Sequence, residues 1–429
     1  MPQDNYIRNL LNIKDQNITF VEDGVSDMKI KDKTCKVIDA KLSYIPKYCD
    51  KCGTVFESNN DFEKKGFDKG SFVVIPSICK MDSYLFLKKQ RILCHHCNCS
   101  FVCRTKLVNF GCFISTPTKL SIVADLVKKR SEKDIALDNN VSPNTVERII
   151  DSYYKGKKLY KHHLPTVLSF DEFKSVKSAK GKMSFHLCDG ITGKTIDIVE
   201  DRKFNSLFKY FSYYTHNARK QVKFIVIDMY SPYIKLIKSL FPHAKIIIDK
   251  FHLTELISRS LNKTRIKAMK KDKKNYNKLK RYWKLVLKSR YELDSSKWKK
   301  FKCFDNLMTE VDVVDYIINT NEELKNTYQL YQDLLYSLQN DNYTVLNASL
   351  NANYGTISEY MTTSLKTINK YINYIKNTLK HKYHNGFIEG NNNFIKVIKR
   401  IAFGFRNFSR FKARIMICKG LISPKRKEA

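Results

Sequence analysis

The chain has 429 residues, of which 43% are hydrophobic, and this length and composition suit about three packed domains. Seventy-eight Lys and Arg against 42 Asp and Glu give a formal charge of +36, which favours a polyanionic partner, with nucleic acid as the leading candidate. No apolar run approaches the roughly 18 residues of a membrane-spanning helix, and the N-terminus does not resemble a signal peptide. We therefore expect a cytoplasmic protein without a membrane partner, whose 12 cysteines are reduced.

Two Cys-x-x-Cys pairs lie in the N-terminal region, residues 1–112. Cys49 and Cys52 precede a glycine, and Cys94 and Cys97 follow a long stretch with a strand-like pattern. Two such turns, each directing two thiolates at one tetrahedral ion, are typical of a zinc ribbon. We predict Zn²⁺ bound by these four cysteines, with ordinary buried thiols as the alternative. Rival ligands stand beside the second pair, namely His95, His96, Cys99 and Cys103.

Residues 113–160 have a helical pattern and predict a helix-turn-helix domain. Ser131 and Ser142 are candidate N-caps, and Pro143 suits the first position of the last helix. In this motif the second helix of the pair enters the major groove of DNA. The same pattern also fits a plain three-helix packing unit. The DNA contacts that we expect from the last helix are Asn144, Thr145 and Arg148.

Between residues 161 and 260, short apolar runs alternate with helical segments and predict the first part of an α/β catalytic core. One run ends at Asp171 and opens a three-stranded meander; two later runs, ending at Asp228 and Asp249, flank a helix-length segment. This order is expected of a ribonuclease-H-like sheet, in which the first and fourth strands are neighbours. Asp171 and Asp228 then lie side by side at the strand ends, where open α/β sheets place their chemistry. Alternatively, Asp228 only caps the helix that follows it.

Residues 261–381 are rich in Lys and almost free of Gly and Pro, and their apolar residues recur mostly three and four apart. This pattern predicts amphipathic helices. Several cations and a tryptophan there suit contacts to backbone phosphates and to an unpaired base, while a solvated basic face explains them equally well. The candidates for DNA contact are Lys270, Lys271, Lys273, Lys274, Arg281 and Trp283.

Residues 382–429 complete the predicted core with a helix and a basic tail. Glu389 falls near the start of a helix with an apolar face and would point back to the strand ends. Alternatively, this first-turn carboxylate only complements the helix dipole. The tail interleaves aromatic residues with Arg406 and Arg410, a pattern that suits DNA contact as well as packing on the core.

Four short segments follow the cysteine pairs and the helix-turn-helix in a fixed order: Ser169-Phe-Asp171-Glu-Phe, Ile227-Asp228-Met, Asp249-Lys-Phe-His252 and Asn385-Gly-Phe-Ile-Glu389-Gly-Asn391. Together these motifs resemble the DDE transposases of the bacterial ISL3 insertion-sequence family. The resemblance implies that Asp171, Asp228 and Glu389 form an acidic triad that binds two divalent cations, and that Asp249 and His252 match the family's Asp-x-x-His signature. It also implies that residues 261–381 form an all-helical insertion.

The predicted function is therefore that of a DNA transposase that binds terminal inverted repeats and cleaves and transfers DNA strands. Three carboxylates can hold two divalent metals about 4 Å apart, and hard oxygen ligands suit Mg²⁺ or Mn²⁺. We expect double-stranded DNA, as repeat and as target, to be the partner of a homodimer or higher oligomer, associated with the bacterial nucleoid. The alternatives are an inactive DNA-binding regulator derived from a transposase, against which the intact triad argues, and a structure-specific nuclease without strand transfer.

Overall fold

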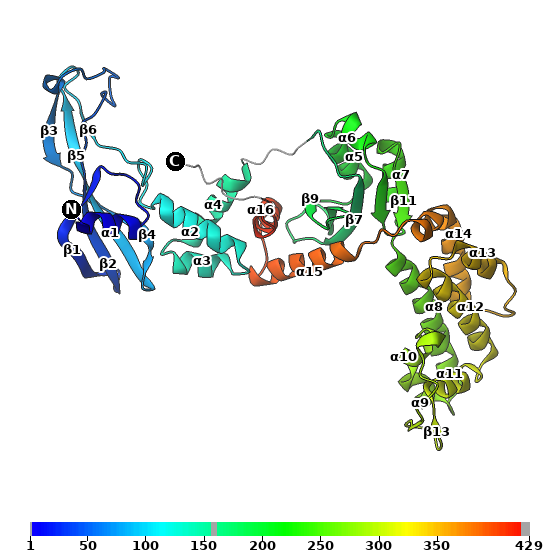
Figure 1. Cartoon of the computed structure of the whole chain (residues 1–429). Coiled ribbons are helices and arrows are strands. Elements are labelled where there is room, and N and C mark those ends of the chain that lie inside the picture. The colour runs from blue at the N-terminus through cyan, green and yellow to red at the C-terminus, as the bar shows by residue number, and fades with distance from the viewer. Residues whose placement is uncertain (1, 156–160, 422–429) are drawn as a thin grey trace. The chain divides into compact units, whose positions relative to one another are not determined.

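A computed structural model describes residues 2–155 and 161–421 of the chain (Figure 1). It divides the chain into two compact units: Met1–Lys158 with Val176–Ser178 and Ile395–Ala429, and Leu159–Ser175 with Ala179–Phe394. Each unit contains a β-sheet and several helices, so the predicted mixed α/β class is confirmed. The domain ends predicted at residues 160 and 429 lie outside the described residues. No helix within the described ranges is long and apolar enough to cross a membrane.

The first unit begins with a six-stranded sheet. Its strands have the order β1-β2-β5-β3, with β4 and β6 also paired to β5, and only β2 and β5 run parallel. The long β5 alternates buried and exposed residues along most of its length, as a half-buried strand should. Only the C-terminal end of β5, where it pairs with β3 and β6, lies near the cysteine pairs. The sheet is therefore larger than the predicted zinc ribbon. The elements are α1 (Pro2–Leu10), β1 (Ile18–Ile30), β2 (Lys33–Leu42), β3 (Phe62–Phe67), β4 (Ser71–Ile78), β5 (Met81–Cys94) and β6 (Ser100–Val102).

Three helices follow the sheet, α2 (Thr116–Val127), α3 (Glu132–Asp138) and α4 (Pro143–Lys155). The hydroxyl of Ser131 accepts a hydrogen bond from the backbone N of Asp134, so Ser131 is the N-cap of α3, as predicted. Asn140 takes a left-handed conformation with φ 51° in the turn between α3 and α4. Asparagine tolerates this conformation better than most residues, which explains a tight turn without glycine.

The C-terminal helix α16 (Phe408–Cys418) belongs to the same unit and packs on these three helices. Ala413, Met416 and Ile417 extend the buried apolar cluster of α2, α3 and α4. Arg414 is only 1% exposed, and its guanidinium donates hydrogen bonds to the carbonyls of Lys128 and Arg130. The structure thus divides the segment 382–429, which sequence analysis assigned as a whole to the catalytic core.

The second unit contains a five-stranded sheet with the strand order β11-β10-β7-β8-β9. Strands β7, β8 and β9 form an antiparallel meander, while β10 and β11 run parallel to β7. The first strand of this sheet therefore pairs with the fourth, as the sequence predicted. The elements are β7 (Val167–Lys174), β8 (Met183–Asp189), β9 (Thr195–Val199), α5 (Phe204–Ser212), α6 (His216–Lys220), β10 (Phe224–Ile227), α7 (Ser231–Leu240) and β11 (Lys245–Ile248).

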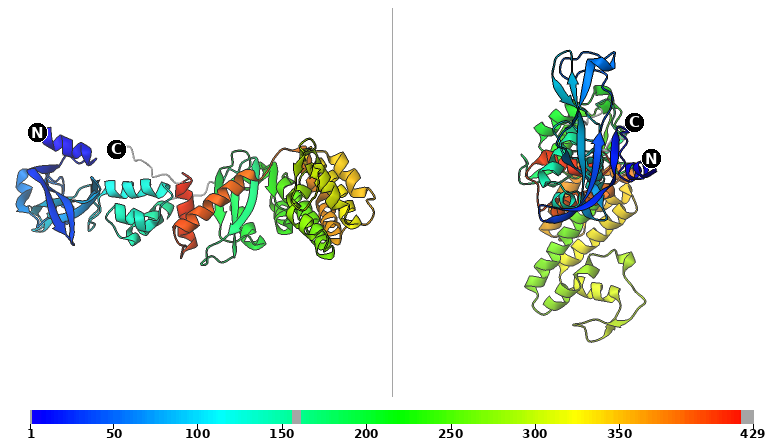
Figure 2. Two further views of the ribbon diagram at one scale, coloured as in Figure 1. Left: turned by 90° about the horizontal axis from the view of Figure 1, so that it is seen from below. Right: turned by 90° about the vertical axis from the view of Figure 1, so that its left-hand side faces the viewer.

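A helical insertion separates β11 from α15 (Gly386–Ile401), and Figure 2 shows its helices, green to orange, lying side by side. It is not all-helical as predicted, because β12 (Lys299–Lys300) and β13 (Leu307–Met308) form a short hairpin in which Phe301 and Phe304 are buried. Each of these strands has only two residues, which is too short for a periodic pattern in the sequence. The helices are α8 (Lys250–Lys271), α9 (Tyr276–Arg281), α10 (Trp283–Val286), α11 (Glu310–Ile318), α12 (Glu322–Gln339), α13 (Tyr343–Asn351) and α14 (Glu359–Lys380).

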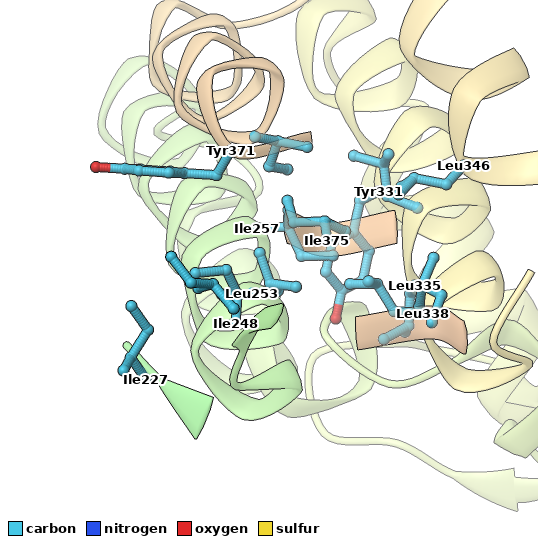
Figure 3. Close-up of a cluster of buried hydrophobic side chains, with 14 of the residues drawn as sticks. Ile227, Ile248, Leu253, Ile257, Tyr331, Leu335, Leu338, Leu346, Tyr371 and Ile375 are labelled. Atoms are coloured by element: carbon cyan, nitrogen blue, oxygen red, sulfur yellow. The ribbon is translucent and has the colours of Figure 1, made fainter. Parts of the chain in front are cut away.

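The insertion and the parallel edge of the sheet share one apolar core. Figure 3 shows Ile227 and Ile248 from β10 and β11 near Leu253 of α8, with Tyr331 of α12 and Ile375 of α14 farther into the same cluster. Helix α14 also covers the outer edge of β11, because the hydroxyl of Thr378 bonds to both the backbone N and the carbonyl of Ile248, at 3.0 and 2.8 Å. Covering this edge protects a strand that would otherwise present unpaired groups. The insertion therefore supports the strand ends from one side.

Candidate active site

Three aspartates, Asp171, Asp228 and Asp249, lie side by side at the C-terminal ends of the parallel strands of the second sheet. β7 and β10 run parallel with Ser169 opposite Val226, so Asp171 and Asp228 reach the same level two residues later. β10 and β11 are in register in the same way and bring Asp249 beside Asp228. As the strand order predicted, Asp171 and Asp228 are neighbours. The carboxyl ends of parallel strands are where open α/β sheets bind their ligands, so this edge is the candidate active site.

His252 joins the aspartates from the first turn of α8. Its Nε2 lies 2.9 Å from Oδ1 of Asp228, and this hydrogen bond raises the pKa of His252 to about 9. The imidazole is therefore protonated at neutral pH. Asp249 is 3% exposed, burial raises the pKa of its carboxyl, and its Oδ1 accepts a hydrogen bond from the backbone N of Asn385. Ligand atoms of Asp228, Asp249 and His252 lie within 4.8 Å of one another, a group that can hold a metal ion.

Asp171 is the most perturbed acid of the site. Burial, and then the charge of Asp228, raise the pKa of its carboxyl to about 7. Its Oδ1 accepts a hydrogen bond from the backbone N of Glu172, and its Oδ2 accepts one from the amide of Asn392, each at 2.6 Å. Neighbouring carboxylates resist being charged together unless a cation neutralises them. The oxygen donors of this site therefore fit a hard divalent cation such as Mg²⁺ or Mn²⁺.

A buried polar chain holds Asp171 from behind. Because the amide nitrogen of Asn392 donates to Asp171, its oxygen must accept, and it does so from Nδ1 of His186 at 2.8 Å. Nε2 of His186 is then the acceptor for the hydroxyl of Thr195, at 3.0 Å. His186 is 0% exposed and Asn392 is 6% exposed. These groups fix the orientation of the carboxylate without being open to solvent, so they are positioning residues.

No motif of the sequence indicates this polar chain. The one signal available is the run Asn391-Asn392-Asn393, which begins two residues after Glu389 on a helix whose other sheet-facing residues are apolar. A buried Asn on such a face needs partners, and those of Asn392 lie on β7 and β8, more than 200 residues earlier in the chain. No local pattern connects them.

Glu389 lies in the first turn of α15 and is exposed. Its charge contributes to the raised pKa of Asp171, so the two carboxylates interact electrostatically. The start of α15 is tied to the sheet by Asn385, whose side chain donates to the carbonyl of Phe170, and by Asn391, whose side chain donates to the carbonyl of Gly193. Glu389 is nevertheless not part of the compact group that Asp228 forms with its two close neighbours.

The four predicted zinc ligands come together in the first unit. Sγ atoms of Cys49 and Cys97 lie 3.7 Å apart, and those of Cys52 and Cys94 lie 3.9 Å apart. All four sulfurs lie within 4.8 Å of one another, so this cluster can hold a zinc ion. Hydrogen bonding with Thr54 lowers the pKa of Cys52, whereas burial and hydrogen bonds to the neighbouring cysteines raise the pKa of Cys97, so without a metal the cluster favours the thiolate at Cys52 and the thiol at Cys97.

The rival ligands have other contacts. Nδ1 of His95 lies 2.7 Å from the carbonyl of Asn60, and Nε2 of His96 lies 3.2 Å from Oδ1 of Asp61. Cys103 is buried, and neither it nor the exposed Cys99 belongs to the sulfur cluster found among the described residues. The two Cys-x-x-Cys pairs are thus the ligand set that the geometry favours.

The predicted groove contacts on α4 differ in exposure. Asn144 and Arg148 are exposed, as a groove contact requires. Thr145 is only 7% exposed, and its hydroxyl lies 3.1 Å from that of Ser142 and accepts a hydrogen bond from Arg148. Its side chain closes the first turn of α4, which does not fit the role of a groove contact.

The other candidate DNA contacts lie on the C-terminal segment and on the insertion. Arg406 is exposed, whereas Arg410 forms ion pairs with Glu147 and Asp151 of α4. The exposed candidates on the insertion form a basic rim around the end of α8 and the start of α10; they are Lys270, Lys271, Lys273, Lys274, Arg281 and Trp283, the last 39% exposed.

The second unit is an α/β fold with a group of acidic residues at its strand ends that can hold a metal ion, and comparison with known proteins identifies the family of the chain. A family model described as a transposase, for the DDE transposases of ISL3 elements, matches residues 168–415, which is more than half of the chain. The chain belongs to the ISL3 family of DDE transposases.

Two curated relatives match parts of the chain. A transposase for insertion sequence element IS1001 of Bordetella parapertussis is 26% identical over 255 residues, which cover 58% of this chain and 59% of the relative. A Lactococcus lactis subsp. lactis protein named ATP-dependent protease is 43% identical over 113 residues, 26% of this chain and 36% of the relative. The chain thus spans about three fifths and about a third of the length of these relatives.

Proposed function

We propose that the chain is an active transposase that binds the terminal inverted repeats of its insertion sequence and catalyses DNA strand cleavage and strand transfer. The observation that carries the proposal is the strand register that sets Asp171 beside Asp228, with Glu389 close enough to act on Asp171. The order β9-β8-β7-β10-β11 is the order of a ribonuclease-H-like core and supports this assignment. Membership of the ISL3 family supports it as well.

The metal site of this reaction comprises Asp171, Asp228 and Glu389. Divalent cations bound there would activate the attacking oxygen and stabilise the leaving oxygen of the phosphodiester. Asp171, which holds a proton up to about pH 7 in the free protein, would give up that proton when a cation binds. Asn392 keeps one oxygen of the Asp171 carboxylate fixed while this happens.

His252 and Asp249 act beside the carboxylates. The protonated imidazole of His252 donates to Asp228 and presents positive charge at the strand ends, where it can orient the scissile phosphate. Asp249 caps α8 and adds to the charge that keeps His252 protonated. In cleavage the nucleophile is water, and in strand transfer it is the 3′-hydroxyl that cleavage leaves, so one site serves both steps without a covalent enzyme intermediate.

The remaining parts bind DNA. The sulfur cluster holds a structural Zn²⁺ that folds the end of β5 with its neighbouring turns. Asn144 and Arg148 of α4 contact bases in the major groove of the terminal repeat, and the basic rim of the insertion contacts phosphates of any sequence. The protein acts on nucleoid DNA in the cytoplasm, as a homodimer or higher oligomer that brings two element ends together.

The test is an assay with the purified full chain and a supercoiled plasmid that carries both ends of its element. In Mg²⁺ we expect strand cleavage at the element ends and, with time, joining of those ends to target DNA. Cleavage without any joined product would identify a structure-specific nuclease instead. Specific binding without cleavage in either Mg²⁺ or Mn²⁺ would identify an inactive regulator.

A further inference from the structure

The loop between α15 and α16, two helices labelled in Figure 1, contains one phenylalanine whose side chain is exposed to solvent. Phe403 is 97% exposed, more than any other large hydrophobic residue among the described ones. Its backbone has φ 52°, a left-handed conformation that is costly for a bulky residue, and its N donates a hydrogen bond to the carbonyl of Arg400. A left-handed residue just past a helix end is usually glycine, so a phenylalanine in this position costs stability relative to glycine.

The neighbouring aromatic residues behave differently. The rings of Phe405 and Phe408 lie 5.1 and 6.3 Å from the ring of Phe411, centroid to centroid, and Phe411 is 0% exposed. Within nine residues, therefore, three phenylalanines join a packed cluster and one is excluded from it. Phe403 contributes nothing to this core, so a folding role does not explain its side chain.

The charges around Phe403 indicate what it meets. Residues 390–421 contain eight Lys or Arg and neither Asp nor Glu. Arg400 and Arg406, three residues to either side of Phe403, are both exposed. An apolar ring flanked by two guanidinium groups suits a ligand with stacked apolar faces between anionic edges, which describes a DNA base step and its phosphates.

The loop is also fixed relative to the predicted groove-binding helix. Arg410, in the first turn of α16, forms ion pairs with Glu147 and Asp151 of α4, and these acids stand on either side of Arg148 in sequence. Helix α16 completes the apolar core of α2, α3 and α4 in the same unit. These contacts fix α16 against α4, and the Phe403 loop is joined directly to the N-terminus of α16.

We propose that Phe403 is a wedge that inserts between two base pairs of the DNA held by α4 and kinks the duplex, while Arg400 and Arg406 bind the phosphates on each side. The proposal rests on the proposed DNA binding and extends it to DNA deformation. Apolar wedges partly unstack a base step, and the energy this costs is recovered through the additional contacts that bent DNA makes.

The test compares the affinity of the full chain for two 30-bp duplexes of one sequence, fully paired or with a single central mismatch. A mismatched step is already partly unstacked, so a wedge protein binds it more tightly, here by about tenfold. In Phe403→Ala this preference should fall to about onefold, while affinity for the paired duplex changes less than about threefold. The fluorescence of a 2-aminopurine placed at the mismatch should increase when wild type binds and should stay low when Phe403→Ala binds.

Three variants separate the wedge from the fold. Phe403→Gly removes the ring and relieves the left-handed strain, so it should melt at the same or a higher temperature than wild type and still lose the preference for the mismatch. Phe110→Ala removes another phenylalanine of the same unit, 75% exposed, and should keep the preference. Phe403→Trp should retain it as well.

Each remaining outcome would overturn the proposal. Equal binding of both duplexes by wild type, or an unchanged mismatch preference in Phe403→Ala, would leave DNA binding intact and reject the wedge. Absence of binding to either duplex would reject the wedge and the proposed function together. If Phe403→Ala converts a dimer to a monomer in sedimentation and leaves duplex binding unchanged, the ring is a contact between copies of the chain.

Discussion

The chain contains two candidate metal centres that are built in opposite ways. The sulfur cluster takes four ligands from two short turns at one end of one sheet, and its sulfurs approach one another to 3.7 and 3.9 Å. The acidic site takes carboxylates from three strands and from a helix more than 130 residues later in the chain. One set of ligands is soft and complete, whereas the other is hard, open and partly exposed.

Under the proposed function, this difference assigns a structural role to the sulfur cluster and a catalytic role to the acidic site. Four thiolates close a tetrahedral site and leave no position for a substrate, so such a centre contributes folding energy. In the acidic site, several carboxylates lie close together and repel one another when no cation is bound. Burial keeps Asp171 protonated up to about pH 7, and His252 supplies a positive charge to Asp228. Strongly shifted pKa values of this kind are typical of functional sites, which supports the catalytic assignment.

The largest effect is expected at the sulfur cluster. Cys94→Ser should release about one equivalent of zinc and unfold the N-terminal sheet locally, because structural zinc contributes on the order of 10 kcal/mol to such folds. The second unit should keep its melting transition. Metal analysis with calorimetry measures both. Cys103→Ser, which alters a buried thiol outside the cluster, is the matched control and should retain the metal. Zinc-free wild-type protein with a normal N-terminal sheet would refute the assignment.

At the acidic site we expect loss of activity without loss of fold. Asp228→Asn or Glu389→Gln should lower the rate of strand cleavage in Mg²⁺ by roughly 1,000-fold or more, about 4 kcal/mol, because each removes a metal ligand. Affinity for DNA should stay the same or rise, since a negative charge facing phosphate is removed. Gel-shift and nicking assays measure the two effects separately.

The control for Glu389 is Glu322→Gln. Glu322 is also an exposed acid in the first turn of a helix, α12, so its change alters the helix dipole interaction alone. It should leave cleavage unchanged. If Glu389→Gln cleaves DNA at a rate near that of wild type, Glu389 is not a metal ligand. It then only complements the dipole of α15, as Glu322 does for α12.

A smaller effect concerns stability and pH without divalent ions. The pKa of Asp171 is about 7 in the folded protein and about 3.8 when unfolded, so the folded state binds the proton more tightly. The stability this provides is fully present below pH 4 and is lost as pH rises through 7, by up to roughly 4 kcal/mol. Asp171→Asn should remove this loss and melt at a higher temperature than wild type at pH 8 in EDTA. Parallel melting curves between pH 5 and 8 would show that Asp171 ionises normally.

The smallest effects concern DNA binding. We expect sequence-specific binding to depend on the first unit and nonspecific phosphate binding to depend on the second unit. Arg148→Ala should cost about 1 to 3 kcal/mol on the terminal repeat and much less on random DNA. Changing Lys270, Lys271, Lys273 and Lys274 together to Gln should weaken binding to both duplexes alike and flatten the salt dependence, since phosphate contacts act through counterion release. Titrations at several salt concentrations test both. Equal weakening on both duplexes by Arg148→Ala would make α2, α3 and α4 a packing unit only.

The sequence predicted those parts of the two centres that depend on local patterns. Cys-x-x-Cys turns determine their own geometry, so the clustering of these four cysteines is predictable without knowing the fold. Apolar runs ending at Asp171 and Asp228, with a meander between them, imply adjacent strands, because few strand orders accommodate that sequence of elements. In both cases the signal lies within a few residues of the functional group.

The parts that were missed depend on contacts across the chain. The amide of Asn392 reaches Asp171 only because α15 lies against β8, and the buried His186 reveals its role only through that amide. The apolar face of α16 fits a sheet or a helix bundle equally well by pattern, and the buried Arg414 with its carbonyl partners is visible only in the fold. The spacing of apolar residues in the sequence indicates which face of a helix is buried, but it does not indicate which element packs against that face.

The most direct test of the central claim replaces Mg²⁺ with Fe²⁺ and adds ascorbate, so that hydroxyl radicals cut the backbone next to the bound ion. If Asp171, Asp228 and Glu389 share one metal site, mass spectrometry should find cuts near all three residues, and excess Mg²⁺ should suppress them. Cuts confined to the surroundings of Asp228, Asp249 and His252, with none near Asp171 or Glu389, would contradict the triad and assign the ion to the compact group instead.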